Sequence, residues 1–147
     1  DGGKTKIGLE STIVDLTDKV SILRPGGITI EQLEKVLHRK IKLKNLLKNI
    51  KSPGQLGFHY SPGIPVRLNV KYPKKNEAFL KFSGKTKNKN NYFTLSKNGN
   101  MREAAKNLFS TLRLIKKGGY SSIAVGKIPN QGLGLAINDR LKKASHK

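Results

Sequence analysis

The strongest constraint on the fold is a helix followed by an apolar run near the end of the chain. Residues 101–117 place apolar side chains on one helical face, with Asn100 before them as an N-cap and a Gly-Gly pair after them. Residues 121–129 then form a short apolar run, which is typical of a buried parallel strand. Because a helix between parallel strands must cross over the sheet, this pattern predicts an α/β sheet with at least one parallel pair.

The segments around this pattern complete the predicted second half of the chain. Alternating apolar side chains predict strands over residues 66–72, 78–83 and 91–96. The lysine- and asparagine-rich residues 85–91 are predicted to form a solvated hairpin loop between the last two strands. From Leu133 onward, a stripe of apolar side chains predicts a final helix.

Two β-branched segments predict a strand pair in the first half of the chain, over residues 11–17 and 20–26. Thr29 and Gln32 have the spacing of a capping box, so we expect a short helix over residues 30–39. The first half therefore also combines strands with a helix.

A segment rich in Pro and Gly, residues 52–65, separates the two halves and carries no Lys, Arg, Asp or Glu. Before it, residues 40–51 change from an alternating to a helical period, which predicts a strand that gives way to a helical turn. We therefore divide the chain into residues 1–51, an extended linker, and a small domain over residues 66–147.

The positive charge lies mostly in this small domain. Residues 66–147 hold 19 Lys and Arg against 3 Asp and Glu, a net +16, whereas residues 1–51 hold 11 against 6, a net +5. A basic domain fits a polyanion partner, and Phe79, Phe82 and Phe93 lie among its lysines as base-stacking residues would. However, Lys outnumbers Arg 24 to 6, as AT-rich coding produces. We favour coding bias, and a core role for the three rings.

Composition excludes several classes of protein. Cys is absent, which rules out disulfides and thiolate metal sites and suits a cytoplasmic protein. No apolar run approaches the length of a membrane span, so no membrane partner is expected. The sequence opens at Asp1 rather than Met, and we expect it to be the C-terminal part of a longer protein.

Few residues show the spacing that metal binding or catalysis needs. His38, His59 and His146 are far apart and lack suitably spaced companions, so no metal site is predicted. The Gly-Lys-Thr of residues 84–86 lacks the upstream Gly of a phosphate-binding loop and is interpreted as a turn. No catalytic residue is identifiable from these patterns.

Four motifs, taken together, carry a family resemblance: "GLESTIVDLT" (residues 8–17), "ILRPGGIT" (22–29), "SPGQLGFHYSPGIPVRL" (52–68) and "GLGLAINDRLKKAS" (132–145). In this order they resemble the two-domain threonylcarbamoyl-AMP synthases of the YrdC type. Those enzymes convert ATP, with Mg²⁺, L-threonine and bicarbonate to threonylcarbamoyl-AMP and pyrophosphate. The resemblance implies that the product passes to the tRNA threonylcarbamoyl transferase machinery, and it leaves direct tRNA contact open.

The resemblance also implies a fold for each part of the chain. Residues 1–51 correspond to the end of the twisted α/β YrdC-like catalytic domain. Residues 52–65 correspond to the linker that closes over the catalytic cavity, and residues 66–147 to a small Rossmann-like α/β accessory domain. The overall fold class expected is therefore α/β.

Four residues of this sequence match the family's substrate-contacting positions. Ser11 matches the position that contacts threonine and ATP, and a hydroxyl there can donate to a carboxylate or phosphate oxygen. Arg24 matches an ATP-contacting arginine whose planar guanidinium suits phosphate oxygens, and the alternative is a surface ion pair with Asp15 or Asp18. His59 and Tyr60, in the linker, match lid residues that exclude water from a labile mixed anhydride.

The family's K-x-R and S-x-N motifs are absent from residues 1–51, which correspond to its catalytic domain, so we expect the chain alone to be inactive. Two other interpretations remain open. Residues 66–147 can be a non-enzymatic, basic nucleic-acid-binding module. Alternatively, they can be a regulatory or assembly domain that holds the linker closed.

Overall fold

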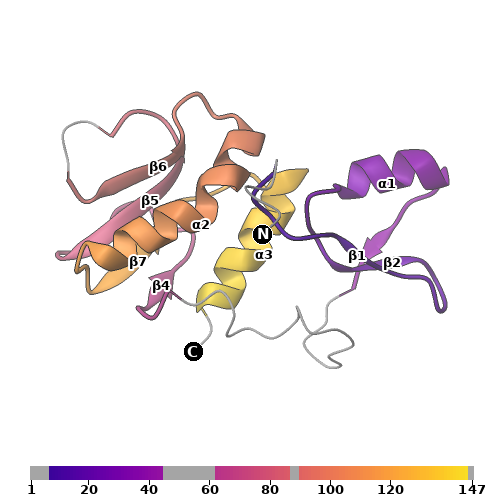
Figure 1. Cartoon of the computed structure of the whole chain (residues 1–147), viewed down its shortest axis with the longest axis horizontal. Helices are drawn as coiled ribbons and strands as arrows, with labels where there is room; N and C mark the ends of the chain where they lie inside the picture. Colours follow the sequence, from indigo (N-terminus) through magenta and orange to yellow (C-terminus); the bar gives the residue numbers. More distant parts are fainter. Residues whose placement is uncertain (1–6, 45–61, 87–89, 146–147) are drawn as a thin grey trace, which may run out of the picture.

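The structure, a computed structural model of the 147-residue chain, describes residues 7–44, 62–86 and 90–145. Two sheets are seen there, the first with one helix and the second with two (Figure 1). The elements in chain order are β1 (Ile13–Asp15), β2 (Ser21–Arg24), α1 (Ile30–Leu37), β3 (Lys42–Leu43), β4 (Val66–Arg67), β5 (Glu77–Ser83), β6 (Tyr92–Ser96), α2 (Met101–Lys117), β7 (Ser122–Val125) and α3 (Leu133–Ser145). We call β1–β3 with α1 the first unit, and β4–β7 with α2 and α3 the second unit.

The first unit is built on an antiparallel pair, β1 and β2, as the sequence predicted. Asp15 organises the turn between them, because its Oδ1 accepts hydrogen bonds from the hydroxyl (2.6 Å) and backbone N–H (3.0 Å) of Thr17. These bonds, with Lys44 beside the other oxygen at 3.1 Å, hold the pKa of Asp15 well below its usual range. The Lys44 contact also ties β1 to the residue that follows β3, which pairs parallel to β2.

Helix α1 begins at the predicted capping box. The Thr29 hydroxyl accepts from the Gln32 backbone N–H at 3.3 Å, and the Thr29 N–H donates to Gln32 Oε1 at 2.9 Å. The helix ends at His38, which adopts a left-handed conformation with φ of 50°. None of the residues of α1 is buried, and Val36 is 74% exposed.

All strand pairs described in the second unit are parallel, in the order β4-β7-β5-β6. The crossover from β6 through α2 to β7 confirms the parallel pair predicted from the helix and the apolar run. The hairpin predicted between β5 and β6 is wrong, because Phe79 lies beside Tyr92 and Ser83 beside Ser96 in parallel register. Alternation reveals a strand but not its direction. Asn91 fixes the direction, since its side chain donates to Glu77 O and its carbonyl accepts from Phe79 N.

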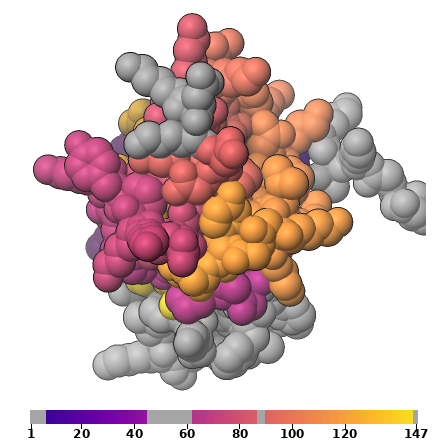
Figure 2. All heavy atoms as spheres, turned by 90° about the vertical axis from the view of Figure 1, so that its left-hand side faces the viewer, coloured from indigo at the N-terminus to yellow at the C-terminus, as the bar shows by residue number. Residues whose placement is uncertain are grey.

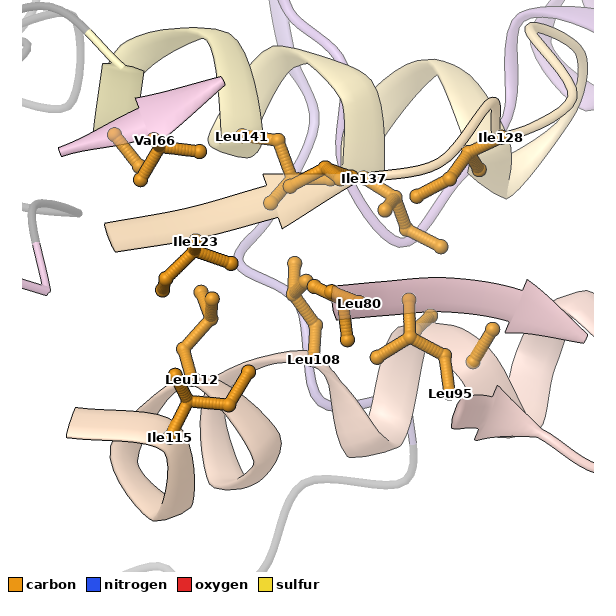
Figure 3. Packing of buried hydrophobic residues seen from close by; sticks show 14 of the residues in the cluster. Val66, Leu80, Leu95, Leu108, Leu112, Ile115, Ile123, Ile128, Ile137 and Leu141 are labelled. Carbon is orange, nitrogen blue, oxygen red and sulfur yellow. The ribbon is translucent and has the colours of Figure 1, made fainter. Parts of the chain in front are cut away.

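Strands β4–β7 and helices α2 and α3 enclose a single core (Figure 3). The apolar stripes predicted for the two helices are buried there, including Leu108, Leu112 and Ile137. Leu9, which precedes the first unit, is 8% exposed and belongs to the same core. The second unit is therefore completed by a residue from the start of the chain.

Candidate functional site

Ser11 and Arg24, which the sequence singled out separately, lie in direct contact. Arg24 Nε donates to the carbonyl oxygen of Ser11 at 3.2 Å, and Nη2 donates to the same oxygen at 3.0 Å and to Ser11 Oγ at 3.2 Å. Arg24 is only 9% exposed, while Ser11 is exposed. A buried cation thus lies beneath a hydroxyl that faces solvent.

The turn after β2 folds back onto the backbone around Ser11. Gly27 N–H donates to Glu10 O at 3.0 Å, and the Thr12 hydroxyl both donates to Ile28 O (2.6 Å) and accepts from Ile28 N–H (3.1 Å). In the sequence, the motifs "GLESTIVDLT" (residues 8–17) and "ILRPGGIT" (residues 22–29) are separate segments. The structure shows that each holds the other in place.

Gly26 explains why this turn is glycine-rich. A Cβ atom at Gly26 would lie 2.4 Å from both Glu10 O and Thr12 N, and 2.5 Å from Ser11 C. These are backbone atoms, so no side-chain rotation relieves the clash. The close approach therefore requires glycine at position 26. The signal for this approach in the sequence is that the two motifs, residues 8–17 and 22–29, occur close together along the chain.

The arrangement of Ser11 and Arg24 suits recognition of an anion. Ser11 Oγ accepts a hydrogen bond from Arg24, which leaves its own O–H to donate to a carboxylate or phosphate oxygen. Burial of Arg24 disfavours the surface ion pair considered as its alternative. The Asp15 carboxylate is instead bound by Thr17 and Lys44.

His59 and Tyr60 lie outside the described residues, so their predicted role as a lid stays a prediction. The same holds for most of the linker and for the helical turn predicted within residues 40–51.

Apart from the Ser11 site, a hollow of about 340 Å³ lies at the amino ends of the strands of the second unit. Residues 76–77, Asn91 and residues 118–120 line it, and Figure 2 shows the face on which these segments meet. The Glu77, Asn91 and Tyr120 side chains of its lining are already bonded within the protein, for example Tyr120 Oη to Asn90 O at 3.0 Å. This hollow therefore offers less to a ligand than the exposed hydroxyl of Ser11.

Other candidate chemistries find little support in the residues that the structure describes. They contain no group of three or more His, Asp or Glu side chains that could hold a metal ion, and no helix long and apolar enough to cross a membrane. Phe79 is buried against Tyr92, with ring centroids 5.1 Å apart. Phe82 and Phe93 pack on the core, as expected for strand residues rather than base-stacking platforms.

Comparison with known proteins places this chain in a family. Residues 28–146 match the sequence model of the threonylcarbamoyl-AMP synthase C-terminal domain. The chain belongs to this family. The family recognised from the four motifs is therefore confirmed, and the matched region begins before the linker and includes α1.

Two curated relatives in this family extend well beyond the region that this chain matches. A threonylcarbamoyl-AMP synthase of Pyrococcus abyssi is 35% identical over 99% of this chain and 48% of its own length. One from Bacillus subtilis is 30% identical over 99% of this chain and 47% of its own length. The chain thus spans about half the length of the curated relatives it matches.

Solved structures share the fold. The crystal structure of P. abyssi Sua5 complexed with L-threonine has a TM-score of 0.76 and 30% identity, and the match covers 99% of this chain and 48% of that one. A P. abyssi Sua5 variant in which consecutive His and Tyr residues are replaced by Ala gives a TM-score of 0.75, with 99% of this chain and 47% of that one covered. The α/β fold class predicted from the sequence is confirmed.

Proposed function

We propose that this chain is the C-terminal part of an enzyme that makes threonylcarbamoyl-AMP and pyrophosphate from L-threonine, bicarbonate and ATP. The observation that carries the proposal is the buried Arg24 beneath the exposed hydroxyl of Ser11, in the two motifs that resemble the family. A relative of the same fold is known in complex with L-threonine, which supports a threonine site in this enzyme as well.

In the proposed enzyme, Ser11 donates its hydroxyl proton to the substrate carboxylate or to a nucleotide phosphate. Arg24 fixes the Ser11 backbone and hydroxyl, and it adds positive charge where ATP or threonine brings negative charge. We assign no catalytic residue to this chain. Both side chains bind and orient, and proximity of oriented reactants is itself a large contribution to rate.

The proposed division of the chain is residues 1–51 as the end of the catalytic domain, residues 52–65 as the linker, and residues 66–147 as the accessory domain. His59 and Tyr60, the single His-Tyr pair of the sequence, act as a lid over the catalytic cavity. A lid there protects the mixed anhydride product from water.

The exposed surface of the first unit supports the proposal that the rest of the catalytic domain lies outside this chain. Most of the large apolar side chains that the structure leaves exposed lie in or beside this small unit, namely Leu16, Ile28, Val36, Leu37 and Leu43. A cluster of this kind usually marks a surface that another part of a protein covers. We therefore propose that further sequence supplies the K-x-R and S-x-N residues and covers this surface, and that residues 1–147 alone are inactive.

The remaining partners follow from the proposed reaction. Mg²⁺ would accompany ATP, but the described residues offer no carboxylate cluster to hold it, and we assign it no ligand in this chain. The product would pass to the tRNA threonylcarbamoyl transferase machinery. We place the enzyme in the cytoplasm, in keeping with the absence of Cys.

Pyrophosphate release that depends on both threonine and bicarbonate tests the proposal. The full-length enzyme should show it and residues 1–147 should not. Activity in residues 1–147 would refute the division of labour, and its absence in the full-length enzyme would refute the function. In the active enzyme, His59→Ala should lower turnover or raise loss of the intermediate to water, while His146→Ala should do neither.

A second candidate function is nucleic-acid binding by residues 66–147. The three acidic side chains of this part are already bonded within the protein, Glu77 to Arg67, Glu103 to Ser96 and Asp139 to Arg140 and Lys143. Several described lysines of this part, among them Lys97, Lys106 and Lys127, are exposed. Binding to tRNA that persists at moderate salt, with a steep log-log dependence on salt, would favour this function. Loss of all binding at physiological salt would favour coding bias.

A third candidate is a regulatory or assembly role, in which the accessory domain holds the linker closed. The observation that favours this role is that Leu9 packs into the core of the second unit. Removing the chain after Pro65 from the full-length enzyme should then change turnover without abolishing substrate binding. Unchanged turnover would exclude it.

A further inference from the structure

We propose that Arg140 is a positioning residue for Ser11 and acts through Glu10, so that helix α3 of the second unit sets the geometry of the substrate-contacting segment. The inference rests on the proposed function of Ser11. It concerns a contact between residues 130 positions apart, which no motif spacing predicts.

The contact itself is a buried guanidinium on a partly exposed carboxylate. Arg140 Nε donates to Glu10 Oε2 at 2.8 Å, and the Arg140 side chain is 0% exposed while that of Glu10 is 36% exposed. Nη1 donates to Asp139 at 2.5 Å, which orients the guanidinium from the other side. Hydrogen bonds between charged partners are the stronger class, and a planar guanidinium holds them in a fixed direction.

The residues before Glu10 are docked on the same unit. Leu9 is buried in the core formed by β4–β7, α2 and α3. Gly8 has φ of +73°, and a Cβ atom there would lie 2.6 Å from the Cα of Lys106 on α2. Glycine is thus needed for the chain to pass close to this helix. Figure 1 shows the start of the described chain lying beside α2 and α3.

The residues after Glu10 belong to the site. The Glu10 carbonyl accepts from Gly27 N–H at 3.0 Å, and Ser11 is the next residue along the chain. Arg24, in the first unit, donates hydrogen bonds to Ser11, and Arg140, in the second unit, donates one to Glu10. The position of the Ser11 hydroxyl is therefore fixed by two guanidinium groups on different units. Loss of the Glu10 contact leaves only one of them.

Kinetics of the full-length enzyme test the inference. Glu10→Ala should raise KM for L-threonine about tenfold, the size of effect expected from losing one charged hydrogen bond that orients a binding group, with kcat changed about twofold or less. Arg140→Lys should give an intermediate rise and Arg140→Met the full one. Lys142→Met is the matched control, since Lys142 is an exposed cation on the same helix.

A structural measurement makes the test independent of activity. Hydrogen exchange at the Gly27 amide, which donates to Glu10 O, should become at least about tenfold faster in Glu10→Ala and stay unchanged in Lys142→Met. Glu10→Ala removes a partly exposed side chain, so it keeps the inference testable even where Arg140→Met fails to fold.

The outcomes separate the two proposals. An inactive wild-type enzyme would overturn the proposed function, and the exchange measurement would still decide whether Arg140 positions the segment. In an active enzyme, unchanged KM and unchanged Gly27 exchange in Glu10→Ala would overturn the inference and leave the function standing. An equal rise of KM in Lys142→Met would also overturn it, because α3 would then act through its general stability.

Discussion

The guanidinium of Arg24 bonds both the carbonyl and the hydroxyl oxygen of Ser11, so that one buried side chain sets the position and the orientation of the exposed one. Nε and Nη2 share the carbonyl, which only a planar fork can achieve. Replacing this arginine should therefore disturb substrate binding before it disturbs the fold.

The first prediction concerns this fork. Arg24→Lys keeps the charge but cannot bond the carbonyl from two nitrogens, so KM for threonine and ATP should rise about tenfold in the full-length enzyme. Arg39→Lys, at an exposed position, serves as the control and should leave both constants unchanged. If the KM values of Arg24→Lys match those of the wild type, the contact of two guanidinium nitrogens with the Ser11 carbonyl has no role in substrate binding.

The second prediction uses the neighbouring glycines of the turn. Gly26→Ala should displace the Ser11 backbone and lower activity, because the new methyl would meet backbone atoms at 2.4 to 2.5 Å. Gly27→Ala meets only the flexible Ile7 side chain at 3.3 Å and should be milder. Steady-state kinetics of both variants measure the difference, and equal losses would contradict the packing of the two motifs.

The third prediction concerns Glu77, which is buried beside Arg67 at 2.6 Å. The Arg67 guanidinium is the largest cause that lowers the pKa of Glu77 to about 2. Because the folded pKa lies below the unfolded value, this stabilisation is present above about pH 4.5 and is lost as the pH falls toward 2.

Arg67→Met should therefore destabilise the second unit at neutral pH, since it leaves the Glu77 carboxylate buried without its main partner. The difference from wild type should shrink at pH 3, where Glu77 becomes protonated in the variant. Urea unfolding at pH 7 and pH 3 measures it. A difference that does not depend on pH would show that Arg67 stabilises by packing alone.

The fourth prediction concerns the "GLGL" start of α3. A methyl group on Gly134 would lie 2.0 Å from Pro129 O, so Gly134→Ala should cost about 3 kcal/mol. Gly132 has open space but a φ of +54°, and Gly132→Ala should cost about 1 kcal/mol. Thermal unfolding of the two variants should rank them in this order, and the reverse ranking would contradict the close approach.

Local signals in the sequence were enough for the helices. Asn100 caps α2 by accepting from Glu103 N–H at 2.9 Å, as its position before the apolar stripe suggested. The capping box of α1 is likewise a property of four consecutive residues. Such features depend on neighbours along the chain, which a single sequence displays directly.

Features that depend on distant residues escaped prediction. The predicted strand over residues 66–72 is reduced to Val66–Arg67, because β4 lies at the sheet edge and pairs only with β7. The direction of β6 depends on Asn91 bonding across to β5, and the contact of Glu10 with Arg140 joins opposite ends of the chain. Contacts between residues this far apart produce no spacing pattern in the sequence.

The burial of Leu9 has a consequence for how proteins of this kind can be recombined. Residues 52–65, the proposed linker, would be the natural place to exchange one half for that of a relative, yet Gly8 and Leu9 would then lack the α2 and α3 residues that they pack against. A hybrid joined there would keep its chain continuous and lose part of its inner packing. Glu10 is bonded to the second unit and Ser11 to the first, so the boundary between the two units lies between these residues. A successful exchange of the second unit would therefore have to include residues 1–10.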